Sequence, residues 1–225
     1  MTDRIAGQSA QGSAQKGEAR GAPRGAQRER AGAIVRTAIG AAVFLSAASA
    51  AGRSLTDREV DVFRSVNGLP DVLLPEIWSA MQFGTFATIP VLSGLALRSG
   101  RRELAFRIAA GGAAGYVAAR VAKHAVRRSR PGVLLEGVRL RGAHADDDGF
   151  PSGHAAVSAA LAVAIGAALP PPWGRVARGL AAATSLGRVY VGAHLPLDVV
   201  GGAGLGIALA SALEVLRARG SANRF

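Results

Sequence analysis

Long uncharged apolar segments constrain this chain more than any other feature. Between Ile77 and Leu97 the sequence has 21 consecutive uncharged residues, about the length that a helix needs to cross a hydrocarbon layer of about 30 Å. The segment from Ala33 to Gly52 is interrupted only by Arg36. A soluble domain of this size has little room to bury such segments, so they predict insertion into a membrane.

Six such segments predict an all-α bundle of six transmembrane helices. Residues 1–30 are rich in Gln, Gly, Ser, Ala and Pro and lack apolar periodicity, which predicts a disordered basic tail. The transmembrane domain is then expected over residues 31–217 and a short cytoplasmic tail over 218–225. The six expected helices are 33–52, 77–97, 108–122, 155–169, 176–192 and 197–216.

Cleavage of the first segment as a signal peptide is an alternative, because Ala48-Ser49-Ala50 has the small-residue pattern of a cleavage site. Its apolar run of roughly 20 residues is longer than the ~7–15 expected of such a peptide. We therefore expect the segment to be retained as a helix.

The charge distribution predicts orientation and excludes some partners. The net charge is +12 and the chain has no Cys, which excludes a disulfide framework and a thiolate metal site. Nucleic acid is not an expected partner, because the basic residues lie between apolar runs. With a cytoplasmic N-terminus, each of the four expected cytoplasmic segments is net basic, in agreement with the positive-inside rule.

The outer loop 123–153 breaks this rule. We expect a functional reason for its positive charge, and an anionic ligand would supply one. The loop contains Lys123, Arg127, Arg128, Arg130, Arg139 and Arg141.

Lys123 and Arg130 form the first of three candidate motifs. They lie two helical turns apart if the helix continues to Pro131, so both would share one face. The planar fork of an arginine and the compact charge of a lysine could bind one phosphate from two sides. Alternatively, both side chains extend from a helix end to the membrane boundary.

The second motif is Pro151-Ser152-Gly153-His154, directly before an apolar run. Ser152 is a suitable N-cap, and the free N–H groups of the following turn favour an anion. Gly153 permits its close approach, and His154 could donate a proton to a departing oxygen. An ordinary capped helix with an interfacial histidine explains the motif equally well.

The third motif runs from Arg188 through His194 to Asp198. Pro196 suits the first turn of a helix, which places Asp198 near enough to accept the Nδ1 proton of His194 and leave Nε2 as a nucleophile. A lone histidine is more often structural, but an ionisable pair at a membrane helix end is a candidate functional site. All three motifs fall on the same predicted side of the membrane.

Together the motifs resemble those of the type 2 phosphatidic acid phosphatase superfamily, which includes bacterial lipid phosphatases and vanadium haloperoxidases. Its pattern is Lys, six residues, Arg-Pro; then Pro-Ser-Gly-His; then Ser-Arg, five residues, His, three residues, Asp. The motifs here, within residues 123–198, match this order and spacing. The resemblance covers about residues 60–216, and Gly187 departs from it where the family usually has Ser.

The resemblance implies a mechanism for each matching residue. His194 attacks phosphorus to form a phosphohistidine, Asp198 orients it, and His154 protonates the leaving oxygen. The resemblance requires no metal or other cofactor. A metal site at Asp146-Asp147-Asp148 is the less favoured interpretation of that run, since three adjacent carboxylates cannot easily face one ion. The phosphoryl oxygens are expected to be bound by Lys123, Arg130, Ser152, Gly153 and Arg188.

We therefore expect a multi-pass lipid phosphatase in a bacterial cytoplasmic membrane, with its active site on the extracytoplasmic face. Polyprenyl diphosphate is the first candidate substrate, followed by phosphatidylglycerophosphate, phosphatidate and a polyprenyl-phosphosugar phosphate. A phosphotransferase using the same intermediate, or a non-catalytic protein that binds or transports a lipid phosphate, are the alternatives. The haloperoxidase function is not favoured, because those relatives are typically soluble.

Overall fold

Every regular element that the structure describes is a helix, which confirms the all-α prediction. The computed structural model describes residues 24–142 and 148–222. The elements are α1 (Arg24–Ala51), α2 (Asp57–Asn67), η1 (Asp71–Leu73), α3 (Leu74–Met81), η2 (Gln82–Gly84), α4 (Thr88–Arg98), α5 (Arg102–Val126), α6 (Pro131–Leu134), α7 (Gly153–Ala168), α8 (Pro171–Tyr190) and α9 (Pro196–Ala222).

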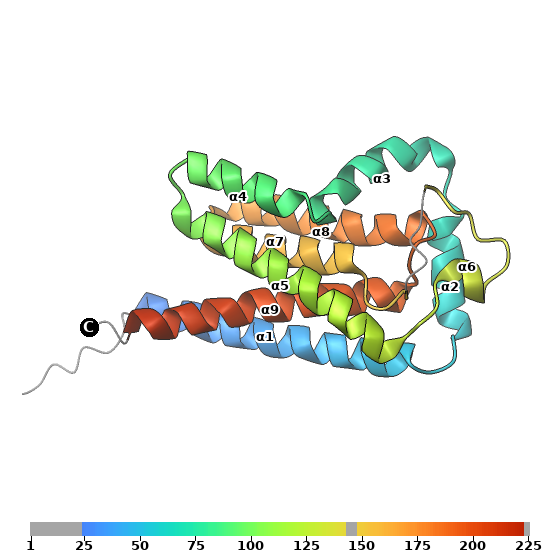
Figure 1. The fold of residues 1–225 in the computed structure, drawn as a ribbon, viewed down its shortest axis with the longest axis horizontal. Helices are drawn as coiled ribbons and strands as arrows, with labels where there is room; N and C mark the ends of the chain where they lie inside the picture. Colours follow the sequence, from blue (N-terminus) through green and yellow to red (C-terminus); the bar gives the residue numbers. More distant parts are fainter. Residues whose placement is uncertain (1–23, 143–147, 223–225) are drawn as a thin grey trace, which may run out of the picture.

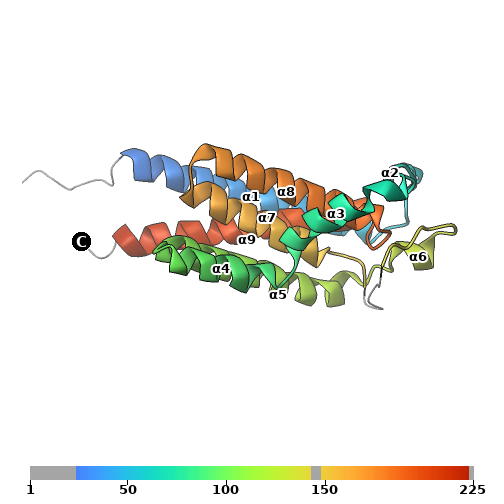
Figure 2. The same cartoon turned by 90° about the horizontal axis from the view of Figure 1, so that it is seen from above.

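The long helices form a bundle around α7. Helices α1, α4, α5, α7, α8 and α9 run along its length, whereas α2 and α6 lie at one end (Figures 1 and 2). Helix α7 packs against α5, α8 and α9, and its residues 155–162 are all buried. Helix α1, which begins within the segment predicted as a tail, packs along α9.

Small residues bring α9 close to its neighbours. A Cβ on Gly206 would lie 2.1 Å from the carbonyl oxygen of Ala156 in α7, and one on Gly204 would lie 2.8 Å from the carbonyl oxygen of Gly40 in α1. Neither position can therefore hold a side chain without moving a backbone. The glycines of α9 at these two positions therefore serve the close packing of helices.

The predicted helix over 77–97 is broken, which corrects the sequence prediction. The segment Asp71–Gly84 meets Thr88–Arg98 at an angle of 69°. At the break, a Cβ on Gly84 would lie 2.6 Å from the carbonyl oxygen of His154. The hydroxyls of Thr85 and Thr88 donate to the carbonyl oxygen of Gln82, which compensates for the interrupted helix.

The predicted number of six membrane spans is supported only in part. Among the described residues, Gln27–Ala51 and Pro196–Arg219 are long and apolar enough to cross a membrane on their own. The bent pair α3–α4 counts as a third span if it is treated as one. The other three spans remain a prediction.

Helix α2 lies across one end of the bundle and packs against α8 and α9 (Figure 1). Thr56 caps it by accepting from the N–H of Glu59. Three residues spaced four apart, Glu59, Phe63 and Asn67, are buried on one face. Phe63 packs in an apolar cluster with residues of α7, α8 and α9. Glu59 is thereby directed toward the end of the bundle where the sequence motifs meet.

Candidate active site

All three sequence motifs converge at the end of the bundle that α2 covers. The N–H of Ser152 donates to the carbonyl oxygen of Asp198 over 2.9 Å, which joins the starts of α7 and α9. The Arg130 guanidinium donates to the carbonyl oxygen of Ala193 over 2.8 Å, so Arg130 reaches the loop that carries His194. The residues predicted to act together therefore lie at one place in the fold.

The N-terminus of α7 has the structure that its sequence predicts. Ser152 is the N-cap, and its hydroxyl accepts from the N–H of Ala155 at 3.4 Å. A Cβ on Gly153 would meet no atom within 4 Å, so an anion can approach the helix start there. His154 follows in the first turn and is half-buried. The helix dipole and free N–H groups make this a favourable position for phosphate.

His194 and Asp198 form a buried pair at the start of α9. Nδ1 of His194 lies 3.6 Å from Oδ2 of Asp198, just beyond hydrogen-bond distance. The same oxygen accepts from the N–H of Leu195 over 2.8 Å, which fixes the carboxylate in its place. The side chains are 3% and 0% exposed, so the pair is shielded from water and the charge of Asp198 acts strongly on the imidazole.

Burial lowers the pKa of the His194 imidazole to about 4. The ionised Asp198 raises this pKa, whereas the positive charges of Arg188 and Arg130 lower it further. His194 is consequently neutral near pH 7, and its Nε2 can act as a nucleophile when the proton is held on Nδ1.

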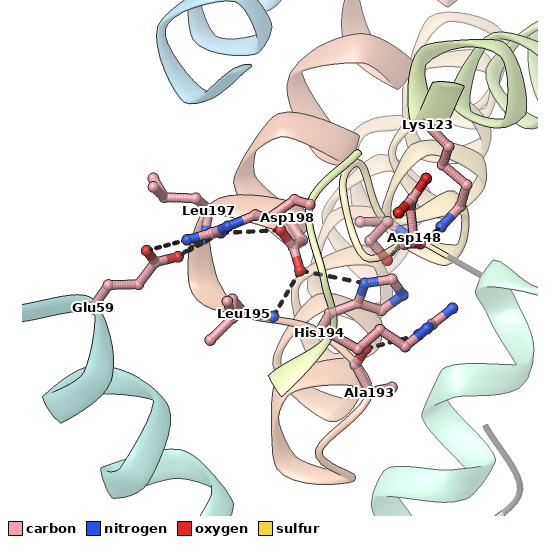
Figure 3. A network of polar contacts seen from close by, with 12 residues as sticks. Glu59, Lys123, Asp148, Ala193, His194, Leu195, Leu197 and Asp198 are labelled. Atoms are coloured by element: carbon pink, nitrogen blue, oxygen red, sulfur yellow. Dashed lines mark hydrogen bonds and ion pairs between the residues drawn. The ribbon is translucent and has the colours of Figure 1, made fainter. Parts of the chain in front are cut away.

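A buried ion-pair chain behind Asp198 was not predicted from the sequence. The Arg128 guanidinium donates to Oδ1 of Asp198 over 3.1 Å and to both carboxylate oxygens of Glu59 over 2.9 and 2.6 Å. Figure 3 shows Glu59 and Asp198 within this network, with His194 and Leu195 in contact with Asp198. Burial lowers the pKa of Arg128, but the bonds and charges of Glu59 and Asp198 raise it overall, so Arg128 remains charged.

Arg128 lies within the first motif and could have been noticed as one of its basic residues. Glu59 gives no local signal, because it is one of several acidic residues in an amphipathic segment. Its importance depends on contacts with residues 69 and 138 positions later in the chain.

Helix α5 does not continue to Pro131, so the condition for a shared face of Lys123 and Arg130 is not met. The helix ends at Val126, and Arg127 adopts a left-handed conformation with φ 48°. Pro131 begins the short helix α6 and does not terminate α5. The break turns Arg128 inward toward Asp198, whereas Lys123, in the last turn of α5, donates to the carbonyl oxygen of Asp148. Lys123 and Arg130 therefore lie on two separate elements.

Two arginines of the basic outer loop, Arg128 and Arg141, have partners within the protein, which accounts for part of the positive charge of the loop. The Arg141 guanidinium lies 4.1 Å from the centre of the Tyr190 ring and pairs with Asp71. It also donates to the carbonyl oxygens of Asn67, Leu69 and Tyr190. Like Arg128, it is buried and paired within the protein, so its charge needs no external ligand.

Arg188 lies in the last turn of α8, as predicted. Its carbonyl oxygen accepts from the N–H groups of Ala193 and His194, which folds the loop back over the helix end. The charge of Arg188 acts on both His154 and His194. The arginine is therefore close enough to both histidines to influence a group bound between them.

Gly187 occupies the position where the resembling family usually has Ser. A Cβ there would lie 2.6 Å from Cγ of Met81 and 2.9 Å from Cγ2 of Ile77. Helix α3 thus fills the space that a serine side chain would need. The departure from the family pattern corresponds to the close packing of α3 on α8.

Among residues 24–142 and 148–222, no group of three His, Asp or Glu side chains lies close enough to share a metal ion. Asp146 and Asp147 of the acidic run lie outside the described residues.

Comparisons with known proteins agree with the geometry. A comparison with protein families matches residues 104–219 to the PAP2 superfamily. The crystal structure of LpxE from Aquifex aeolicus matches with a TM-score of 0.64 and 23% identity, covering 70% of this chain and 94% of that one.

A transmembrane PAP2-type phosphatidylglycerolphosphate phosphatase from Bacillus subtilis matches with a TM-score of 0.61 and 19% identity, covering 83% and 97% of the two chains. A search of curated proteins gives no significant match. The likeness to these two solved structures shows a shared fold.

Proposed function

Because the chain belongs to the PAP2 superfamily, we propose that it is a membrane lipid phosphatase that acts through a phosphohistidine on His194. The observation that carries this proposal is the buried His194–Asp198 pair beside the open N-terminus of α7. A nucleophile and an anion-binding helix start are the two parts that phosphoryl transfer to a side chain requires. Both lie at one end of a bundle of apolar helices.

In the first step, Nε2 of His194 attacks phosphorus and the bond from phosphorus to the lipid oxygen breaks. His154 gives its proton to that oxygen, and the lipid alcohol or lipid phosphate leaves. In the second step, water attacks phosphorus and the bond from phosphorus to Nε2 of His194 breaks. His154 accepts a proton from the water, phosphate is released and His194 is neutral again. Asp198 stabilises the positive charge that His194 carries between the two steps, when the 3.6 Å contact can shorten.

Phosphate binding is assigned to groups that surround the start of α7. Arg130 and Arg188 supply planar forks of donors, and Lys123 supplies a point charge. Ser152 and the N–H of Gly153 complete the site at the helix N-terminus. These groups neutralise the charge of the equatorial oxygens in the transition state.

The site's position supports a lipid substrate at the extracytoplasmic face of a bacterial cytoplasmic membrane. A headgroup can reach the end of the bundle from water while its chains stay in the hydrocarbon. The opposite end carries Arg98, Arg101, Arg102, Arg175, Arg217 and Arg219, as the positive-inside rule predicts for the cytoplasmic side. Polyprenyl diphosphate is the first candidate, with phosphatidylglycerophosphate, phosphatidate and a polyprenyl-phosphosugar phosphate next.

Phosphate release from these four lipids in detergent, with EDTA present, tests the proposal. Wild type is compared with His194→Ala, and size-exclusion chromatography verifies that both are folded. We expect release from at least one lipid by wild type and none by the variant. Turnover only when a sugar or lipid acceptor is added would instead identify a phosphotransferase. Binding without turnover would identify a lipid-phosphate-binding protein.

A further inference from the structure

The ion-pair chain behind the candidate nucleophile links three separate elements. Glu59 comes from α2, Arg128 from the segment after α5, and Asp198 from the first turn of α9. Their side chains are at most 6% exposed. Buried charges are costly unless fully paired, so the chain places strict demands on the position of each element.

Glu59 is engaged on both sides. Its two carboxylate oxygens accept from the two terminal nitrogens of Arg128, the bidentate geometry that fixes a guanidinium plane most firmly. Oε1 also accepts from the N–H of Leu197 over 3.0 Å, one of the unpaired donors at the start of α9. Glu59 therefore attaches Arg128 and the start of α9 to the same point on α2.

Arg128 in turn decides which way the Asp198 carboxylate faces. It binds Oδ1, while Oδ2 is left to the Leu195 N–H and to Nδ1 of His194. With both oxygens engaged, the carboxylate cannot rotate away from the imidazole. Together the side chains of Glu59, Arg128 and Asp198 have a net charge of −1, so the ion-pair chain also favours positive charge on His194.

We propose that Arg128, held by Glu59, is a positioning residue that fixes Asp198 against His194 and sets the charge balance around the nucleophile. This inference rests on the proposed phosphatase activity and adds two residues to it. Neither residue touches the phosphoryl group. Both act through Asp198, as outer-shell groups act through the ligands that they orient.

A purely structural role for the chain makes different predictions. If it only docks α2 onto the bundle, its loss lowers stability but leaves the ionisation of His194 unchanged in the protein that still folds. If it sets the charge balance, removing the positive and the negative member must shift the pKa of His194 in opposite directions. The charged or titratable groups that face His194 are Asp198, Arg188, Arg130 and His154, and all are retained in the variants below.

The variants are Arg128→Met, Arg128→Lys, Glu59→Gln and the double variant Glu59→Gln/Arg128→Met. Arg128→Met leaves the buried Glu59 carboxylate unpaired and can fail to fold. Glu59→Gln keeps the Arg128–Asp198 pair, and the double variant leaves no unpaired charge at Glu59, so these two variants keep the test possible in that case. Arg141→Lys is the matched control. Arg141 is a buried, paired arginine of the same loop that does not contact Asp198.

We expect Arg128→Met to lower kcat by about 10- to 100-fold and to change KM little. Losses of this size are usual for residues that orient a functional side chain without contacting the substrate. Arg128→Lys should recover part of this loss. Glu59→Gln should lower kcat less, and it should have little further effect when Arg128 is already Met, because both act through one path. Arg141→Lys should lower the melting temperature and leave kcat unchanged.

Titration of His194 by NMR with ¹⁵N-labelled histidine provides a readout that needs no substrate. Arg128→Met should raise the pKa of His194 and Glu59→Gln should lower it, with cancellation in the double variant. Coincident titration curves in folded wild type, Arg128→Met and Glu59→Gln would overturn the inference. If wild type hydrolyses no lipid, the proposed function fails, but these shifts still decide whether the chain controls His194.

Discussion

Replacing Gly206 with alanine should separate α7 from α9 and slow the reaction, although Gly206 lies about 15 Å along α9 from its start. A Cβ there would be 2.1 Å from the carbonyl oxygen of Ala156, whereas the carbon-to-oxygen distance in close contacts between helices is about 3.3 Å. The backbones must therefore move apart by about 1.2 Å. Overpacking of this kind costs about 1–3 kcal/mol of stability.

The same displacement reaches the candidate site, because α7 begins at Gly153 and α9 begins two residues after His194. A misplacement of about 1 Å between reacting groups can cost about 100-fold in rate. We expect Gly206→Ala to lower kcat by about that factor in the protein that remains folded, and to lower the melting temperature.

Gly179→Ala is the matched control, since a Cβ at Gly179 in α8 would meet no atom within 4 Å. It should leave kcat unchanged and raise stability slightly, because glycine inside a helix costs roughly 0.5–1 kcal/mol relative to alanine. Thermal unfolding and phosphate release per folded molecule are measured in the same detergent. If the two variants behave alike, α9 tolerates a side chain at Gly206 and the packing argument is refuted.

Gly187→Ser should lower the melting temperature because its Cβ would lie 2.6 Å from Cγ of Met81, and adding Met81→Ala should recover part of the loss; unfolding of the single and double variants checks this. The pKa of His194 is lowered to about 4, so this nucleophile should stay neutral down to about that pH. We therefore expect kcat/KM, followed from about pH 3.5 to 8 and corrected for substrate ionisation, to show no acid limb of the enzyme near pH 6.5; such a limb would contradict the lowered pKa. The melting temperature should fall as the pH drops from about 6.5 to 4, because His194 binds a proton in the unfolded protein at a higher pH than in the folded protein. His194→Asn should flatten this part of the curve of melting temperature against pH. EDTA should leave phosphate release intact, and a loss that a divalent ion restores would argue for a metal.

The parts of the site that follow from local sequence could be predicted. Ser152 before a run of alanines indicates an N-cap, and Pro196 followed by Asp198 indicates the first turn of a helix; both positions agree with the structure. The spacing of the motifs indicates that Lys123, Arg130 and Arg188 belong to one site, although not how they meet. Such features depend on neighbours within one or two helical turns.

The features that could not be predicted depend on distant contacts. At the bend, Gly84 lies close to the His154 carbonyl, and the apolar composition of the segment indicates neither the bend nor this contact. Glu59 resembles its acidic neighbours until Arg128 and Leu197 are placed beside it. Gly187 reads as a departure from a family pattern, and its cause lies in the side chain of Met81.

The end of α5 explains why the basic motif is divided between two elements. A helix that continued to Pro131 would keep Lys123 and Arg130 on one face, but it would not direct Arg128 to Asp198 and Arg130 to the Ala193 carbonyl as the structure does. The left-handed Arg127 makes both contacts possible. The break thus separates Lys123, which stays on α5, from Arg128 and Arg130, which turn toward the loop that carries His194. The six residues between Lys123 and Arg130 therefore span a turn of the chain and do not place the two side chains on one helical face.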